Sequence, residues 1–177
     1  MEADVEFILL PYDSSEGASM LARLTAELNG GRWTRFRAAV AFARSSGNDG
    51  ELIEALKSFS ESGGVIGLTF GADTFAGETK GSDYEAVERV LTSVAPETTR
   101  VHLYHEQGRT FHPKVYLFDN SEKQQALLIV GSSNWGEGGL VTNVEANVAV
   151  HLDLSKSSHA DLYAKVDDCF EVYWSES

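Results

Sequence analysis

The residues whose types and spacing could perform chemistry lie between positions 111 and 147. His112 and Lys114 are separated by one residue, and Asp119 follows Lys114 after four more. Residues two apart on a β-strand project from the same face, so this spacing places an imidazole next to an ammonium group. Pro113 donates no backbone hydrogen bond, which favours a strand that begins at Lys114. The segment therefore predicts a candidate nucleophile beside a cation at the start of a strand.

Two further features follow this segment. A turn with the sequence Gly-Ser-Ser-Asn occupies residues 131–134, and Glu145 lies on a later segment in which polar and apolar residues alternate. The same periodicity puts Asn143, Glu145 and Asn147 on one face of that strand. On the opposite face we expect apolar side chains that pack against the core: Val144, Ala146, Val148 and Val150.

Taken together, these residues resemble the HKD motif of the phospholipase D superfamily, in particular the branch of bacterial nucleases that carry a single motif. The resemblance implies cleavage of a phosphodiester through a covalent phosphohistidine, with no metal and no other cofactor. It implies that His112 is the nucleophile and that Glu145 holds the other nitrogen of its ring. Lys114 and Asn134 match the residues that bind the non-bridging oxygens, one by charge and the other by its amide.

Four nearby residues lie outside this catalytic set. The Ser132 hydroxyl could add another hydrogen-bond donor to the phosphate. Arg109, just before the motif, could reach a substrate phosphate, although an exposed turn arginine is an equally good interpretation. Asp119 ends the strand, and we interpret it as a structural residue that bonds turn amides. Trp135 is expected in the core or in a dimer interface rather than stacked on a base.

The chemistry requires a second imidazole, which protonates the leaving oxygen and then activates water. None of His102, His105, His151 and His159 is followed two residues later by lysine. His102 and His105 face opposite sides of a strand, which does not suit a metal site. The resemblance therefore implies a homodimer in which two copies of His112 meet across a two-fold axis and share one active site.

The elements that would position these residues alternate along the chain. Short β-rich segments lie at 5–10, 36–42 and 65–70, and each is followed by a segment with helical spacing of its apolar residues. Further strands are expected at 100–104, 114–119, 126–130 and 143–152, and an amphipathic helix at 157–174. The pattern predicts an α/β fold, a phospholipase D-like mixed, largely parallel β-sheet flanked by helices on both faces. A chain of 177 residues is expected to form a single catalytic domain over 1–177.

The composition limits the partners. The chain has 14 Lys and Arg against 27 Asp and Glu, a net charge of −13, which disfavours tight sequence-independent DNA binding by this domain alone. We therefore expect a nucleic acid substrate to be bound with help from another domain or partner. No signal peptide or apolar stretch of membrane-spanning length is evident, so a cytoplasmic location without a membrane partner is predicted. The single Cys169 is expected to be a buried structural thiol.

Three functions remain in competition. The first is a phosphodiesterase, most specifically a DNA endonuclease domain. The second is a phospholipase or phosphatidyl transferase, whose known forms usually carry two motifs in a longer chain. The third is a catalytically idle module for dimerisation or nucleic-acid docking, which would need cations but not a nucleophile with its orienting carboxylate.

Overall fold

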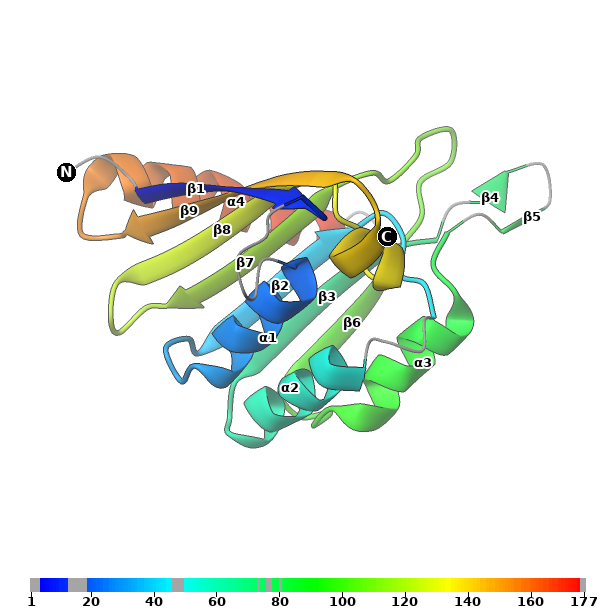
Figure 1. The fold of residues 1–177 in the computed structure, drawn as a ribbon, viewed down its shortest axis with the longest axis horizontal. Helices are drawn as coiled ribbons and strands as arrows, with labels where there is room; N and C mark the ends of the chain where they lie inside the picture. Colours follow the sequence, from blue (N-terminus) through cyan, green and yellow to red (C-terminus); the bar gives the residue numbers. More distant parts are fainter. Residues whose placement is uncertain are drawn as a thin grey trace.

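The computed structural model describes residues 4–12, 19–45, 50–72, 74–75, 78–79 and 81–175, and within them a seven-stranded sheet has helices on both faces (Figure 1). The strands are β1 (Asp4–Leu10), β2 (Arg35–Val40), β3 (Val65–Gly71), β6 (Thr99–Tyr104), β7 (Lys114–Asn120), β8 (Gln125–Gly131) and β9 (Glu145–Asp153). A separate two-stranded pair comprises β4 (Thr74–Phe75) and β5 (Glu78–Thr79). The helices are α1 (Met20–Asn29), α2 (Gly50–Glu61), α3 (Tyr84–Ser93), the π-helix η1 (Gly138–Thr142) and α4 (Ser157–Ser175).

The order of strands in the large sheet is β1-β9-β8-β7-β2-β3-β6. The predicted mixed sheet is confirmed, but the expectation that it is largely parallel is wrong. Only the pairs β2–β3 and β3–β6 are parallel, whereas the pairs β1–β9, β9–β8, β8–β7 and β7–β2 are antiparallel. The lengths of the connections explain these directions. The short turn after β7 can join only antiparallel strands, whereas the helical crossovers after β2 and β3 allow parallel pairing.

Helices cover both faces, as predicted. The face under α1, α2 and α3 carries the larger core, where α1 buries Met20, Leu24 and Leu28 at intervals of four residues. Trp135 is buried in this core, edge-on to Phe70 at 5.6 Å between ring centroids, which confirms its expected core position. Figure 1 shows α4 alone behind the sheet, on the opposite face.

A smaller core lies between α4 and the sheet. α4 packs Val166, Phe170 and Tyr173 into it. The prediction that Cys169 is buried is wrong, since its side chain is exposed. The physical reason is the helical period, which turns Phe170 towards the sheet and its predecessor towards solvent.

A network of ions also holds α4 to the sheet. Asp119, at the far end of β7 from His112, is 3% exposed and accepts two hydrogen bonds from Arg35 Nε at 3.1 and 2.9 Å. Arg35 Nη2 donates to the Tyr163 hydroxyl at 2.6 Å, and Arg37 donates to the Asp167 carboxylate, so both arginines link β2 to α4. The Asp119 side chain therefore pairs with arginines rather than with turn amides, and its structural role lies in joining α4 to the sheet.

Candidate active site

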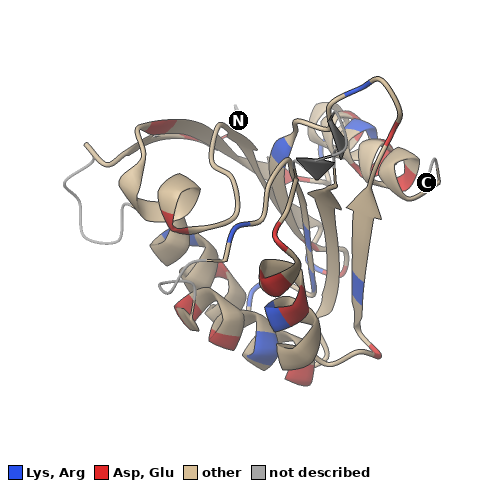
Figure 2. Cartoon of the chain, turned by 90° about the vertical axis from the view of Figure 1, so that its right-hand side faces the viewer, with Lys and Arg blue, Asp and Glu red and all other residues tan. Residues whose placement is uncertain are grey.

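The predicted site residues meet at one edge of the sheet. β8 is antiparallel to both β7 and β9, so β7 and β9 run in the same direction and begin at the same edge. The residue pairs Val40–Lys114 and Gly131–Asn147 show that β2 and β8 end there. Figure 2 looks towards this edge and shows Asp and Glu spread over the helices with Lys and Arg between them.

His112 and Lys114 contact each other directly. Lys114 Nζ lies 3.0 Å from His112 Nδ1 and 3.1 Å from Nε2, and it donates to the His112 carbonyl at 3.3 Å. A ring nitrogen can accept a hydrogen bond from an ammonium only when it carries no proton, which is the form that a nucleophile needs. The His112 side chain is exposed, whereas Lys114 is only 7% exposed. Burial lowers the pKa of Lys114, and the nearby Glu145 carboxylate opposes that shift.

Phe42, two residues beyond the end of β2, borders both His112 and Asn134. Its ring meets the imidazole edge-on, with 6.0 Å between centroids and an interplanar angle of 78°. Its backbone N–H donates to Asn134 Oδ1 at 3.2 Å. The carbonyl of the Asn134 amide is thereby occupied, and the Nδ2 group remains as a hydrogen-bond donor for an anion.

Two polar side chains hold the Glu145 carboxylate. The Ser132 hydroxyl donates to Oε2, and Asn143 Nδ2 donates to Oε1 at 3.2 Å. Ser132 Oγ also accepts a hydrogen bond from the Ala146 backbone N–H at 3.0 Å. Within one chain, the described residues include no hydrogen bond between Glu145 and His112. The orienting role of Glu145 and the phosphate-binding role of Ser132 therefore stay predictions. The Ser132 hydroxyl donates its hydrogen bond to the Glu145 carboxylate.

Hydrogen bonds between the Asn147 side chain and Ser133 hold the turn that carries Asn134. This buried side chain accepts from the Ser133 backbone N–H at 3.3 Å and donates to Ser133 Oγ at 2.9 Å. A Cβ at Gly131 would lie 2.3 Å from both the Ala146 carbonyl and Asn147 Oδ1, so only glycine fits there. Sequence reasoning did not assign roles to Asn143 and Asn147, although both alternate with Glu145 on the polar face of the strand. Phe42 carries no comparable signal in the sequence.

The remaining candidates contact residues outside this group. Arg109 is exposed and pairs with Glu106 at 3.0 Å, and its role at the substrate stays a prediction. His102 stacks on Trp174, His151 lies 3.3 Å from a Glu6 oxygen, and His159 accepts from the Asp153 backbone. Within one chain, none of these imidazoles is positioned to assist His112. Among the residues that the structure describes, no cluster of His, Cys, Asp and Glu could hold a metal ion.

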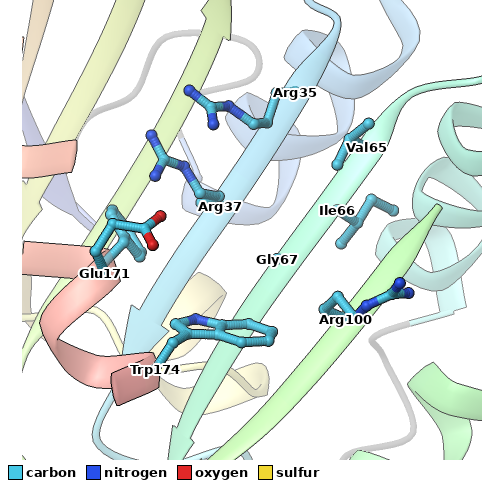
Figure 3. Close-up of a pocket in the computed structure, with 9 residues that line it drawn as sticks. Arg35, Arg37, Val65, Ile66, Gly67, Arg100, Glu171 and Trp174 are labelled. Atoms are coloured by element: carbon cyan, nitrogen blue, oxygen red, sulfur yellow. The ribbon is translucent and has the colours of Figure 1, made fainter. Parts of the chain in front are cut away.

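A cavity lies on the α4 side of the sheet, away from His112. This cavity of about 210 Å³ is bordered by Arg35, Arg37, Arg100 and Trp174. In Figure 3, Arg35 and Arg37 point together while Arg100 points away from them. Because Asp119 and Asp167 already neutralise the first two arginines, the three guanidinium groups do not form a convergent anion site.

Comparison with known proteins identifies the family. Residues 33–174 match the family model described as "Cardiolipin synthase, PLD-like domain", and the chain belongs to this phospholipase D-like family. The matched range contains the complete HKD pattern and all four residues of the predicted catalytic set, His112, Lys114, Asn134 and Glu145. A search of curated protein sequences finds no match.

Solved structures share the fold. NucT from Helicobacter pylori superposes with a TM-score of 0.62 at 18% identity, covering 98% of this chain and 96% of that protein. Nuc from Salmonella typhimurium, described as a phospholipase D family member, gives a TM-score of 0.59 at 15% identity, with coverages of 98% and 95%. These similarities establish that the present chain has the same overall fold as two proteins of nearly equal length. Among the described residues, no helix is both long and apolar enough to cross a membrane.

Proposed function

We propose that this protein is a metal-independent phosphodiesterase, and specifically a cytoplasmic DNA endonuclease domain that acts through a covalent phosphohistidine. The observation that carries the proposal is the contact of an exposed imidazole, His112, with a buried ammonium, Lys114, at the edge where the Asn134 amide also lies. This group combines a nucleophile with two donors for the non-bridging oxygens of a phosphate. The family match and the two structures of similar fold support the same class of reaction.

The proposed reaction has two displacements. First, the unprotonated His112 nitrogen attacks phosphorus, an N–P bond forms, and the bond from phosphorus to the leaving oxygen breaks. The Lys114 ammonium and Asn134 Nδ2 stabilise the charge on the non-bridging oxygens. A second imidazole supplies the proton that the leaving oxygen takes up. That imidazole then removes a proton from water, which attacks phosphorus and releases His112.

We propose that the second imidazole is His112 of a second copy of the chain, so that two subunits share one active site. An exposed apolar row beside the site supports this arrangement. Phe7, Val148 and Val130 are cross-strand partners on β1, β9 and β8, and their side chains are 65%, 37% and 44% exposed. The prediction that Val148 packs into the core is therefore wrong, because α4 covers the sheet only as far as Val115, the next residue along this row. A second subunit is the occupant that would both cover this row and complete the site.

Such a dimer would also give Glu145 a partner. Its carboxylate is held firmly by Ser132 and Asn143, yet it makes no hydrogen bond to the imidazole of its own chain. We propose that it instead orients His112 of the second subunit, fixing the tautomer and stabilising the positive charge that develops on the ring.

The test is cleavage in EDTA of labelled single- and double-stranded DNA, RNA, a phospholipid and bis(p-nitrophenyl) phosphate. We expect the wild type to cleave DNA, and His112→Ala to lose that activity with a stable fold. His105→Ala is the matched control, since His105 is an exposed histidine in the same loop between β6 and β7, directly after the end of β6. Phosphate label trapped on the wild-type protein as an acid-labile adduct would support the covalent step. Absence of any cleavage would favour the idle module, and cleavage of the phospholipid alone would favour the phospholipase.

Subunit mixing tests the shared site. Wild type and His112→Ala, unfolded together in equal amounts and refolded, should retain about a quarter of the wild-type activity if each site needs two intact copies of His112. About half of the activity would remain if each subunit worked alone, and that result would exclude the shared site.

A further inference from the structure

An exposed arginine, Arg44, borders the same aromatic ring as His112. The Arg44 guanidinium carbon lies 5.5 Å from the centroid of the Phe42 ring, and that ring in turn meets His112 at 6.0 Å. The guanidinium is therefore no further from the imidazole than these two distances taken together. Both groups border the Phe42 ring, and the hydrogen bond that the Arg44 guanidinium makes is to Asp83 and not to His112, Lys114 or Asn134. Arg44 therefore lies near the catalytic group without belonging to it, where it can meet a neighbouring part of a substrate.

The backbone around Arg44 is held against the turn that carries Asn134. Trp135 N–H donates to the Phe42 carbonyl at 3.1 Å, and Arg44 N–H donates to the Trp135 carbonyl at 2.8 Å. Gly136 has φ +141°, and a Cβ there would lie 3.1 Å from the Arg44 Cβ and carbonyl oxygen. This close packing fixes the spacing between the arginine and the site, so a substrate would meet both in a constant geometry.

The Arg44 side chain itself is held loosely enough to bind a ligand. Its Nη1 donates to Asp83 Oδ1 at 2.6 Å, but the two side chains are 53% and 40% exposed. Asp83 already accepts a hydrogen bond from the Ser45 backbone at 3.2 Å, so it keeps a partner if Arg44 turns away. An ion pair this exposed contributes little to stability, which means that a phosphate can compete for the guanidinium. Arg35 and Arg37 differ, because they are paired with the buried Asp119 or with Asp167 in the packing of α4.

We propose that Arg44 binds the phosphate adjacent to the scissile one, so that the site selects a polynucleotide strand over an isolated phosphodiester. This inference rests on the proposed phosphodiesterase function and narrows its substrate class. A guanidinium group can donate two parallel hydrogen bonds to the oxygens of one phosphate, and the Phe42 ring, which both Arg44 and His112 border, offers a surface on which the nucleoside next to the scissile phosphate can stack. On a chain with a net charge of −13, a single well-placed cation of this kind would guide the strand into the site without creating general affinity for DNA.

Binding is measured first, in the His112→Ala background, so that the result does not depend on cleavage. The probe is a fluorescein-labelled single-stranded oligonucleotide, followed by anisotropy at several salt concentrations. Adding Arg44→Ala should weaken binding about tenfold and lower the slope of log K against log salt by about 0.7, the contribution of one phosphate contact in a single strand. Arg44→Lys should recover most of the salt dependence but only part of the affinity.

The matched control is Arg32→Ala. Arg32 also lies over an aromatic ring, that of Trp33 at 4.5 Å, and bonds a neighbouring side chain, Gln125, but at the opposite edge of the sheet from the site. Oligonucleotide binding by this variant should match the parent. Equal loss in Arg32→Ala and Arg44→Ala would show a general effect of charge and overturn the assignment. An unchanged affinity and salt slope in Arg44→Ala, or no binding by the parent at low salt, would overturn it as well.

Cleavage then separates this inference from the function on which it rests. In the active protein, Arg44→Ala should reduce kcat/KM for the oligonucleotide at least about tenfold more than for bis(p-nitrophenyl) phosphate, mainly through KM. If the wild type cleaves neither substrate, the proposed function fails, while the binding result still decides the role of Arg44. If both substrates lose activity equally, Arg44 acts on the site itself and the neighbouring-phosphate assignment is wrong.

Discussion

Asp119 belongs to the sequence motif of the active site, yet the structure places it at the other end of β7, so its substitution should affect stability and not chemistry. Asp119→Asn keeps the volume of the side chain and removes its charge. Arg35 Nε would lose its carboxylate partner, and Arg37 would lose a second carboxylate at 3.7 Å. The side chain of Arg37 is 7% exposed, so water cannot replace the missing charge there.

The burial of these side chains sets the expected loss of folding stability in Asp119→Asn. Removal of one partner from a buried ion pair costs about 3–5 kcal/mol. Asp167 remains in contact with both arginines, and the Arg35 side chain is 35% exposed, so the low end of that range, about 3 kcal/mol, is expected. For a domain of this size, each kcal/mol lowers Tm by about 2–4 °C, which gives a decrease of about 6–12 °C.

Thermal unfolding followed by circular dichroism measures this decrease, and cleavage assays well below the lowered Tm measure activity per folded molecule. Asp168→Asn provides the control, because Asp168 is an exposed carboxylate on the same helix as Asp167 and should change stability by no more than about 0.5 kcal/mol. A variant of Asp119 that unfolds at the wild-type temperature would refute the ion-network reasoning. One that stays folded but loses activity would show that Asp119 takes part in the reaction.

Three further predictions concern the site, the dimer and pH. Because burial lowers the pKa of Lys114, activity should fall as pH rises through a range below that of an ordinary lysine, whereas Lys114→Arg should keep its residual activity there. Phe7→Glu should shift the protein from dimer to monomer in analytical ultracentrifugation and abolish activity; an active monomer would exclude the shared site. Burial lowers the pKa of His102, so the unfolded chain binds a proton at higher pH than the folded one, and the free energy of unfolding from urea titrations should decrease on acidification below about pH 6.5. His102→Gln should flatten that pH dependence, and an unchanged slope would contradict it.

Local patterns in the sequence were sufficient for most of the elements. The strand at Lys114–Asn120 begins where Pro113 predicts, and the amphipathic segment after residue 157 forms α4. The direction of the strands was not predictable in the same way, because pairing depends on which strands meet in space. β1 looked like the start of a strand-helix unit but pairs antiparallel with β9, at the other end of the chain. In that pairing Phe7 lies opposite Val148, and both are exposed, although periodicity alone assigns Val148 to the core.

The sequence by itself was enough to predict the chemistry of the site, since the types and spacing of His112, Lys114, Asn134 and Glu145 predict a nucleophile, two phosphate ligands and an orienting carboxylate. Spacing along a strand is enough to place His112 beside Lys114, because the two-residue period is local. Only the tertiary structure decided how these residues are supported. The Phe42 contact with the imidazole and the Arg44 position beyond it arise from a strand end some 70 residues earlier in the chain. Contacts of this kind depend on the packing of distant segments, which no local pattern encodes.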